Sequence, residues 1–291
     1  MIRKNWRPLL LIVCFVIAFF GYRYYDALHT DTENPTISMD ASQLLQVSVK
    51  DPKSALLQGV TAQDRQDGDI SAKLIVEGMQ LIDMDGLLEV TYAVADSSGN
   101  VAKATRQVLY TDYESPKFSL DIPLIYPELS DPDIMSPVGA TDVVDGDIQH
   151  RIRATSLTES RVVGVGIHNV HFQVTNSLGD TSEIVLPVEI VETGSYDADL
   201  TLKETLIYIP QGAKFQPKSY LNSFTYRTEE VSLRYGLPEG FSLKTTGEVN
   251  TQTPGVYPVG YTVTYTIRHD TNSELDQKIV GYSKLIVVVE G

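Results

Sequence analysis

The chain has 291 residues and a formal net charge of −15, with 42% hydrophobic and 21% charged residues. This composition is ordinary for folded protein and excludes wholesale disorder, while the acidic balance predicts no nucleic-acid partner. The one cysteine, Cys14, lies in an apolar run near the N-terminus, so the rest of the chain can form neither a disulfide framework nor a cysteine zinc site.

The first predicted element is an apolar helix. Residues 9–22 are an unbroken apolar run between Arg7 and Arg23, short for a membrane span and equally suited to a signal peptide. Bulky residues follow it where a cleavage site would need small ones, and the flanking side chains could extend the span into the headgroup region. We therefore expect residues 1–25 to be a cytoplasmic N-terminus and membrane anchor. The alternatives are a cleaved signal peptide and lipidation at Cys14, whose bulky neighbours disfavour it.

After a polar linker at 26–33, one module of about 80 residues occurs twice. The acidic phrase Ala-Gln-Asp-Arg-Gln-Asp-Gly-Asp-Ile at 62–70 returns at 140–148 as Ala-Thr-Asp-Val-Val-Asp-Gly-Asp-Ile. Two flanking segments also return in the same order, 33–40 as 114–121 and 92–99 as 172–179. The duplication predicts a first repeat at 34–111 and a second repeat at 114–192.

Apolar and polar residues alternate along the segments that surround the phrase. Leu88, Val90, Tyr92 and Val94 share one face of a predicted strand, and a tight turn at 96–100 follows it. The remaining third block, 198–291, lacks the phrase but keeps alternating strands and is rich in tyrosine. Such short strands bury an apolar face only against another sheet, so the third block is predicted to be a diverged β-sandwich, with Tyr261 and Tyr265 in its core.

The phrase, the following Tyr/Phe-x-Val strand and the Asp/Asn-Ser-x-Gly turn resemble the Ig-like domain of pesticidal crystal proteins and bacterial surface proteins. That domain is similar to hyalin-repeat and cadherin-type modules. The resemblance covers both repeats. It implies an all-β fold of tandem Ig-like β-sandwich domains that works at the cell surface, usually without enzymatic activity.

The aspartates of the phrase are the candidate site. Their oxygens are the ligands that calcium prefers, and Gly68 and Gly146 would let neighbouring carboxylates converge. The alternative is that the same side chains cap turns by accepting hydrogen bonds from nearby backbone amides. The candidate residues are Asp64, Asp67, Asp69 and Asp96 in the first repeat and Asp142, Asp145, Asp147 and Asn176 in the second.

No other pattern indicates catalysis. His168 and His171 are three apart on a predicted strand, so they point to opposite faces and would not share an ion. The sequence holds no nucleophile elbow, phosphate loop or His-Glu-x-x-His motif. We expect a non-enzymatic protein of the bacterial cell surface, anchored by a single membrane pass with its C-terminus extracellular. It would act as an Ig-like stalk and adhesion module with a protein or glycan ligand at the third block. The alternatives are a calcium-binding module that rigidifies the stalk and a cell-envelope glycan-binding protein.

Overall fold

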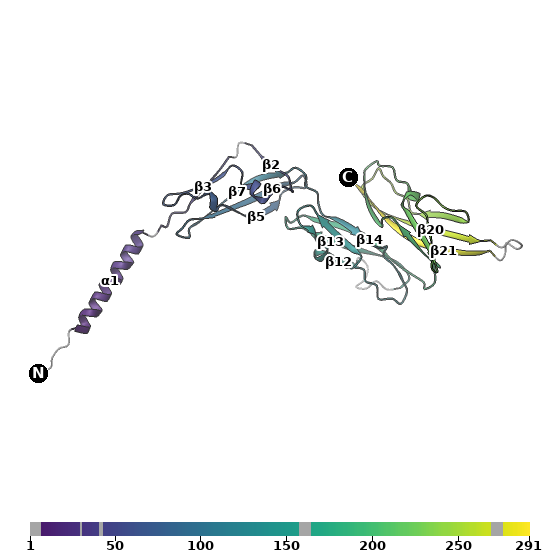
Figure 1. The fold of residues 1–291 in the computed structure, drawn as a ribbon, viewed down its shortest axis with the longest axis horizontal. Helices are drawn as coiled ribbons and strands as arrows, with labels where there is room; N and C mark the ends of the chain where they lie inside the picture. Colours follow the sequence, from purple (N-terminus) through teal and green to yellow (C-terminus); the bar gives the residue numbers. More distant parts are fainter. Residues whose placement is uncertain (1–6, 30, 41–42, 157–163, 269–275) are drawn as a thin grey trace. The chain divides into compact units, whose positions relative to one another are not determined.

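The computed structural model describes residues 7–29, 31–40, 43–156, 164–268 and 276–291 (Figure 1). The chain divides into two compact units, Met1–Tyr113 and Glu114–Gly291. Apart from α1, the long elements of both units are strands, so the all-β prediction is confirmed. α1 spans Arg7–His29, and apolar side chains along it, such as Phe15 and Phe20, are exposed. No helix in the described ranges combines the length and apolarity needed to cross a membrane.

The first unit holds two sheets, with strand orders β1-β3-β4 and β2-β7-β6-β5. Its strands are β1 Thr36–Met39, β2 Leu45–Val47, β3 Val60–Asp64, β4 Gly68–Asp69, β5 Ile75–Leu81, β6 Leu87–Ala95 and β7 Val101–Tyr110. Short 3-10 helices occupy Lys53–Leu57 and Ser71–Lys73. Alternation on β6 is as the sequence predicts: Leu88, Val90 and Tyr92 are fully buried.

The second repeat has the same arrangement, with sheets β11-β10-β8 and β12-β13-β14-β9. Its strands are β8 Lys117–Leu120, β9 Ile125–Pro127, β10 Val138–Asp142, β11 Gly146–Asp147, β12 Arg153–Ser156, β13 Gly166–Thr175 and β14 Thr181–Val191, with a 3-10 helix at Gln149–Arg151. One core cluster takes Phe118 and Val138 from the first sheet and Phe172 and Leu186 from the second. The two sheets therefore face each other as a sandwich.

The third block forms one hydrogen-bonded sheet of seven strands. They are β15 Ala198–Leu202, β16 Leu206–Pro210, β17 Leu221–Tyr226, β18 Glu229–Ser232, β19 Phe241–Thr246, β20 Gly255–Ile267 and β21 Gln277–Glu290, with a 3-10 helix at Pro217–Tyr220. The long β21 pairs with β15 near Gly281 and with β16 from Ile286 to Glu290, so it joins strands that form separate sheets in the repeats. Tyr261 is fully buried and Tyr265 packs against the same core, as predicted.

The second repeat and the third block pack together inside the second unit. Ile286 of β21 belongs to the core cluster of the second repeat. Glu189 of β14 pairs with Lys284 and accepts a hydrogen bond from Tyr282 Oη at 3.1 Å. The Lys284 side chain is only 7% exposed, and removing one partner of so buried a pair would leave an uncompensated charge. These contacts make the two parts one packed body.

Candidate functional site

The acidic phrase first forms a turn that its own aspartate holds. Asp64, the last residue of β3, accepts hydrogen bonds at Oδ1 from the amides of Gln66 and Asp67, both at 2.8 Å. Gly68 then takes a φ of +75°, a backbone conformation that residues other than glycine rarely adopt. The second repeat repeats this geometry: Asp142 Oδ1 accepts from Val144 and Asp145 at 2.8 and 2.9 Å.

The second aspartate of each phrase fastens a distant loop. Asp67 accepts from Ser97 N at 2.7 Å and from Ser97 Oγ at 2.6 Å, and it also pairs with Lys73 at 3.3 Å. The hydrogen bonds from Ser97 hold the pKa of Asp67 below its usual value. This carboxylate connects the turn after β3 to the turn after β6.

The second repeat has an equivalent link between its loops, called here, with that of Asp67, a loop latch. Asp145 accepts from Ser177 N and Oγ at 2.6 and 2.7 Å and pairs with Arg151 at 2.6 Å. Burial raises the pKa of Asp145, but the bonds from Ser177 and the charge of Arg151 outweigh it, so the net pKa is lowered.

The third aspartate of each phrase lies two residues before the next 3-10 helix and accepts from the first residue of that helix. Asp69 accepts from Ser71 N at 2.9 Å and from Ser71 Oγ at 2.6 Å. Asp147 accepts from Gln149 N at 2.9 Å. These two side chains are exposed and act within their own turns.

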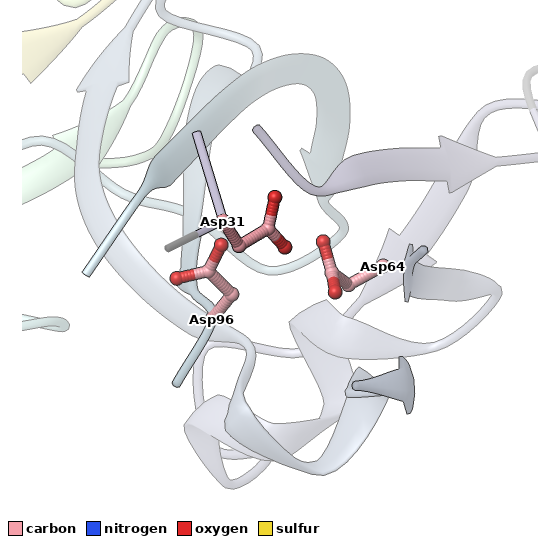
Figure 2. Close-up of side chains that lie close together, drawn as sticks. All are labelled: Asp31, Asp64 and Asp96. Atoms are coloured by element: carbon pink, nitrogen blue, oxygen red, sulfur yellow. The ribbon is translucent and has the colours of Figure 1, made fainter. Parts of the chain in front are cut away.

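In the first unit, three carboxylates from distant parts of the sequence meet (Figure 2). Asp31 precedes β1, Asp64 ends β3, and Asp96 directly follows β6. One oxygen from each lies within 4.8 Å of the others. All three residues are buried, between 6% and 8% exposed. Charged groups held this close in a buried place need compensation from hydrogen bonds or from a cation.

Hydrogen bonds compensate part of this cluster. Asp31 Oδ1 accepts from Glu33 N at 2.9 Å. Asp96 accepts from the amides of Ser98 and Asn100 and, at Oδ2, from Asn100 Nδ2 at 2.7 Å. Burial raises the pKa of Asp96, but the bonds from Asn100 and Ser98 outweigh it and lower the pKa overall, which favours the ionised form.

Asp64 is the incompletely satisfied member. Its Oδ1 holds the turn, whereas its Oδ2 is buried and has no hydrogen-bond partner. Figure 2 shows the Asp64 carboxylate directed at that of Asp31. No ion pair among the described residues involves Asp31, Asp64 or Asp96. The arrangement suits a hard cation bound by carboxylate oxygens.

In the second repeat, the aspartate equivalent to Asp64 has a hydrogen-bond partner for its second oxygen. Asn176 stands where the first repeat has Asp96, and its Nδ2 donates to Asp142 Oδ2 at 3.0 Å. Asn176 Oδ1 accepts from the amides of Leu178 and Asp180, both at 3.0 Å. The amide therefore supplies the partner that Asp64 Oδ2 lacks.

Asp31 was missed by sequence reasoning, which placed it in the 26–33 linker. A signal was present, because Thr-Asp-Thr-Glu-Asn-Pro at 30–35 returns as Thr-Asp-Tyr-Glu-Ser-Pro at 111–116. The repeated sequence therefore begins before residue 34, the predicted start of the first repeat. The counterpart of Asp31, Asp112, instead accepts hydrogen bonds from Ser48 Oγ and Val49 N. The predicted ligand set thus divides: Asp64 and Asp96 meet Asp31, while Asp67 and Asp69 hold turns.

His168 and His171 do not converge on one ion. His168 Nε2 contacts Gly164 O at 2.9 Å, and His171 Nε2 lies 3.2 Å from Glu183. Both lie on β13 and use different neighbours.

A known family model matches part of the chain, within the first repeat. Residues 55–109 match the model of the bacterial surface protein Ig-like domain, which confirms the resemblance drawn from the motifs. A protein of Acholeplasma phage L2, described as an uncharacterized 81.3 kDa protein, is 32% identical over 128 residues, 44% of this chain and 16% of that protein.

Solved structures with some similarity include a bacterial protein and a mouse cadherin. A structure of CBM51-2 in complex with GlcNAc and INT domains, from Clostridium perfringens ZmpB, matches over 89% of this chain and 45% of its own, at 14% identity and a TM-score of 0.22. Mouse cadherin-23 EC22-24 covers 88% and 99%, at 12% identity and a TM-score of 0.21. Superpositions at this level do not define a common arrangement.

Proposed function

We propose that this chain is a non-catalytic recognition and adhesion module of the bacterial cell surface, in which tandem Ig-like domains present a ligand-binding third block. The observation that carries the proposal is the match of the first repeat to the bacterial surface Ig-like domain, together with its second copy of the same strand order. The buried contact between the second repeat and the third block supports it, because a packed junction transmits load between domains better than a loose linker does.

Attachment to the cell through the N-terminal segment is part of the proposal. The apolar residues 9–22 between two arginines support it, as do the exposed apolar side chains of α1. Full-length protein expressed in a Gram-positive host should sediment with membranes and resist carbonate extraction. Release into the soluble fraction would contradict the proposed membrane attachment but not the adhesion proposal.

Surface display and adhesion are tested together on intact cells. Antibodies raised against 198–291 should label unpermeabilised cells that express the chain, and those cells should adhere to a ligand-coated surface. Adhesion should fall to the level of cells without the chain when the same antibodies are added. Labelling only after permeabilisation would contradict the proposal.

A groove in the second unit favours a glycan as the ligand. It has a volume of about 660 Å³ and is lined by Tyr196, Tyr282, Asp197, Asp199 and Arg227, among others. The rings of Tyr196 and Tyr282 stack, with centroids 4.9 Å apart. An aromatic surface beside carboxylates and a guanidinium offers the stacking and hydrogen-bonding groups that sugars require.

Arg227 adds a second indication at this groove. Its φ is +56°, at a two-residue turn between β17 and β18 where glycine would avoid the strain. Labelled full-length chain should bind specific sugars on a glycan array. Asp199→Asn and Arg227→Gly should each weaken that binding by about tenfold, which is roughly the contribution of one hydrogen bond to a charged group. Arg268→Ala, outside the groove, is the control. Binding unchanged by both groove variants would reject this site.

A further inference from the structure

The cluster of Asp31, Asp64 and Asp96 has a feature that turn capping does not explain. A carboxylate that only caps a turn keeps its second oxygen in solvent or gives it a donor. Asp64 Oδ2 has neither, since it is buried and unpartnered, and the Asp64 carboxylate lies in a group with two further buried carboxylates. The second repeat shows that the same fold can supply a donor at this place, since Asn176 provides it.

The chemistry of the donor set points to one class of ligand. Three carboxylates with oxygens mutually within 4.8 Å concentrate negative charge, and no cationic side chain among the described residues pairs with them. Calcium takes six to eight oxygen ligands in flexible geometry and binds carboxylates, carbonyls and water, whereas magnesium demands a near-ideal octahedron. A cluster built from three separate loops supplies the flexible kind of site.

We propose that Asp31, Asp64 and Asp96 bind one calcium ion. The ion fastens the segment that precedes β1 to the ends of β3 and β6, so its binding orders the entrance to the first repeat. The second repeat does not take an ion at Asp142, because Asn176 already satisfies that carboxylate with an amide. This inference stands apart from adhesion and from the groove of the third block.

The test uses full-length chain stripped with a chelator and titrated calorimetrically with calcium chloride, and thermal unfolding with and without the ion. We expect uptake of one ion per chain and a higher unfolding temperature in calcium, because a ligand that binds only the folded state stabilises it. Asp64→Asn and Asp96→Asn should each lower the affinity by at least about tenfold.

Two choices keep the test decisive. Asp96→Asn recreates the arrangement of the second repeat, where asparagine is compatible with the fold, so it guards against a variant that fails to fold. Asp69→Asn removes the same charge from the same phrase outside the cluster and should bind calcium as the unaltered chain does. No uptake at millimolar calcium, or equal affinity in all three variants, would overturn the proposal.

Discussion

The first and second repeats share one turn geometry but differ in the charges that surround it. In both, the aspartate that ends the third strand of the repeat holds a turn through Oδ1. In the first repeat this carboxylate meets two more carboxylates and its Oδ2 has no hydrogen-bond partner, whereas in the second repeat Oδ2 accepts an amide hydrogen from Asn176. The turn is therefore retained although the charge around this aspartate differs. Asn176 replaces Asp96, and Asp112, the counterpart of Asp31, bonds to Ser48 and Val49 instead.

A further exchange accompanies this difference. The first repeat has Asp96 followed by Asn100, and the second has Asn176 followed by Asp180, so acid and amide trade places. In both repeats the first of the two accepts amide hydrogens from the residues two and four positions later. Capping needs only an oxygen, which either side chain supplies, so the position of the charge is free to vary.

The strongest test of the comparison is Asn176→Asp. The change removes the donor to Asp142 Oδ2 and sets two buried carboxylates side by side, which should cost about 3 kcal/mol or more of unfolding free energy at neutral pH. Urea unfolding measures it. Calcium should restore part of the loss, because the variant rebuilds part of the acidic cluster of the first repeat.

Asn169→Asp is the matched control. Asn169 is exposed on β13, so the same chemical change there should stay within about 0.5 kcal/mol. An Asn176→Asp variant as stable as the control in chelator would show that the second repeat tolerates the paired carboxylates, and the contrast between the repeats would fail.

A smaller effect comes from the core below the clusters. Tyr92 and Phe172 occupy equivalent buried positions, but Tyr92 Oη donates to Leu56 O at 2.7 Å and accepts from Arg106 at 3.0 Å. Phe172 lies in an apolar cluster. Phe172→Tyr should cost about 1 to 3 kcal/mol because its hydroxyl finds no partner, and Tyr92→Phe about 1 kcal/mol. Urea unfolding of both variants checks this, and a neutral Phe172→Tyr would reveal a polar partner in the second core.

The loop latch gives a pH-dependent prediction. The folded-state pKa of Asp145 lies below its usual 3.8, so its contribution is present above about pH 4 and is lost as pH falls through the folded value. Asp145→Asn should therefore lower stability by about 1 to 2 kcal/mol at pH 7, through weakened bonds to Ser177, and change little near pH 2. Thermal unfolding across pH measures it. An equal loss at both ends of the range would show that charge plays no part in the latch.

Much of the fold follows from local pattern. Alternation in 88–94 fixes which side chains of β6 are buried, because successive residues on a strand face opposite ways. The repeated phrase likewise predicts two copies of one arrangement, since equal sequences meet equal steric demands. The turn at Asp64 could also be predicted, because an aspartate before a glycine-containing turn accepts hydrogen bonds from the backbone amides that follow it.

The cluster itself could not be predicted in full. Asp64, Asp67 and Asp69 look equivalent in sequence, and only the positions of Ser97 and Ser71 in space decide which of them are already satisfied. Asp31 lies far from the phrase, in a segment with no strand pattern. The single sheet of the third block depends on β21 extending past β15 to reach β16, a pairing that period-two alternation does not specify.

The smallest expected difference concerns the cations beside the two latches. Arg151 lies 2.6 Å from Asp145, whereas Lys73 lies 3.3 Å from Asp67 and is more exposed. Arg151→Ala should lower stability by less than about 1 kcal/mol, and the loss should shrink in high salt, because exposed pairs are screened. Lys73→Ala should have a smaller effect. A double-mutant cycle of Arg151→Ala with Asp145→Asn isolates the pair. A coupling as large as the loss in Asp145→Asn would make Arg151, and not the Ser177 bonds, the group that holds this loop.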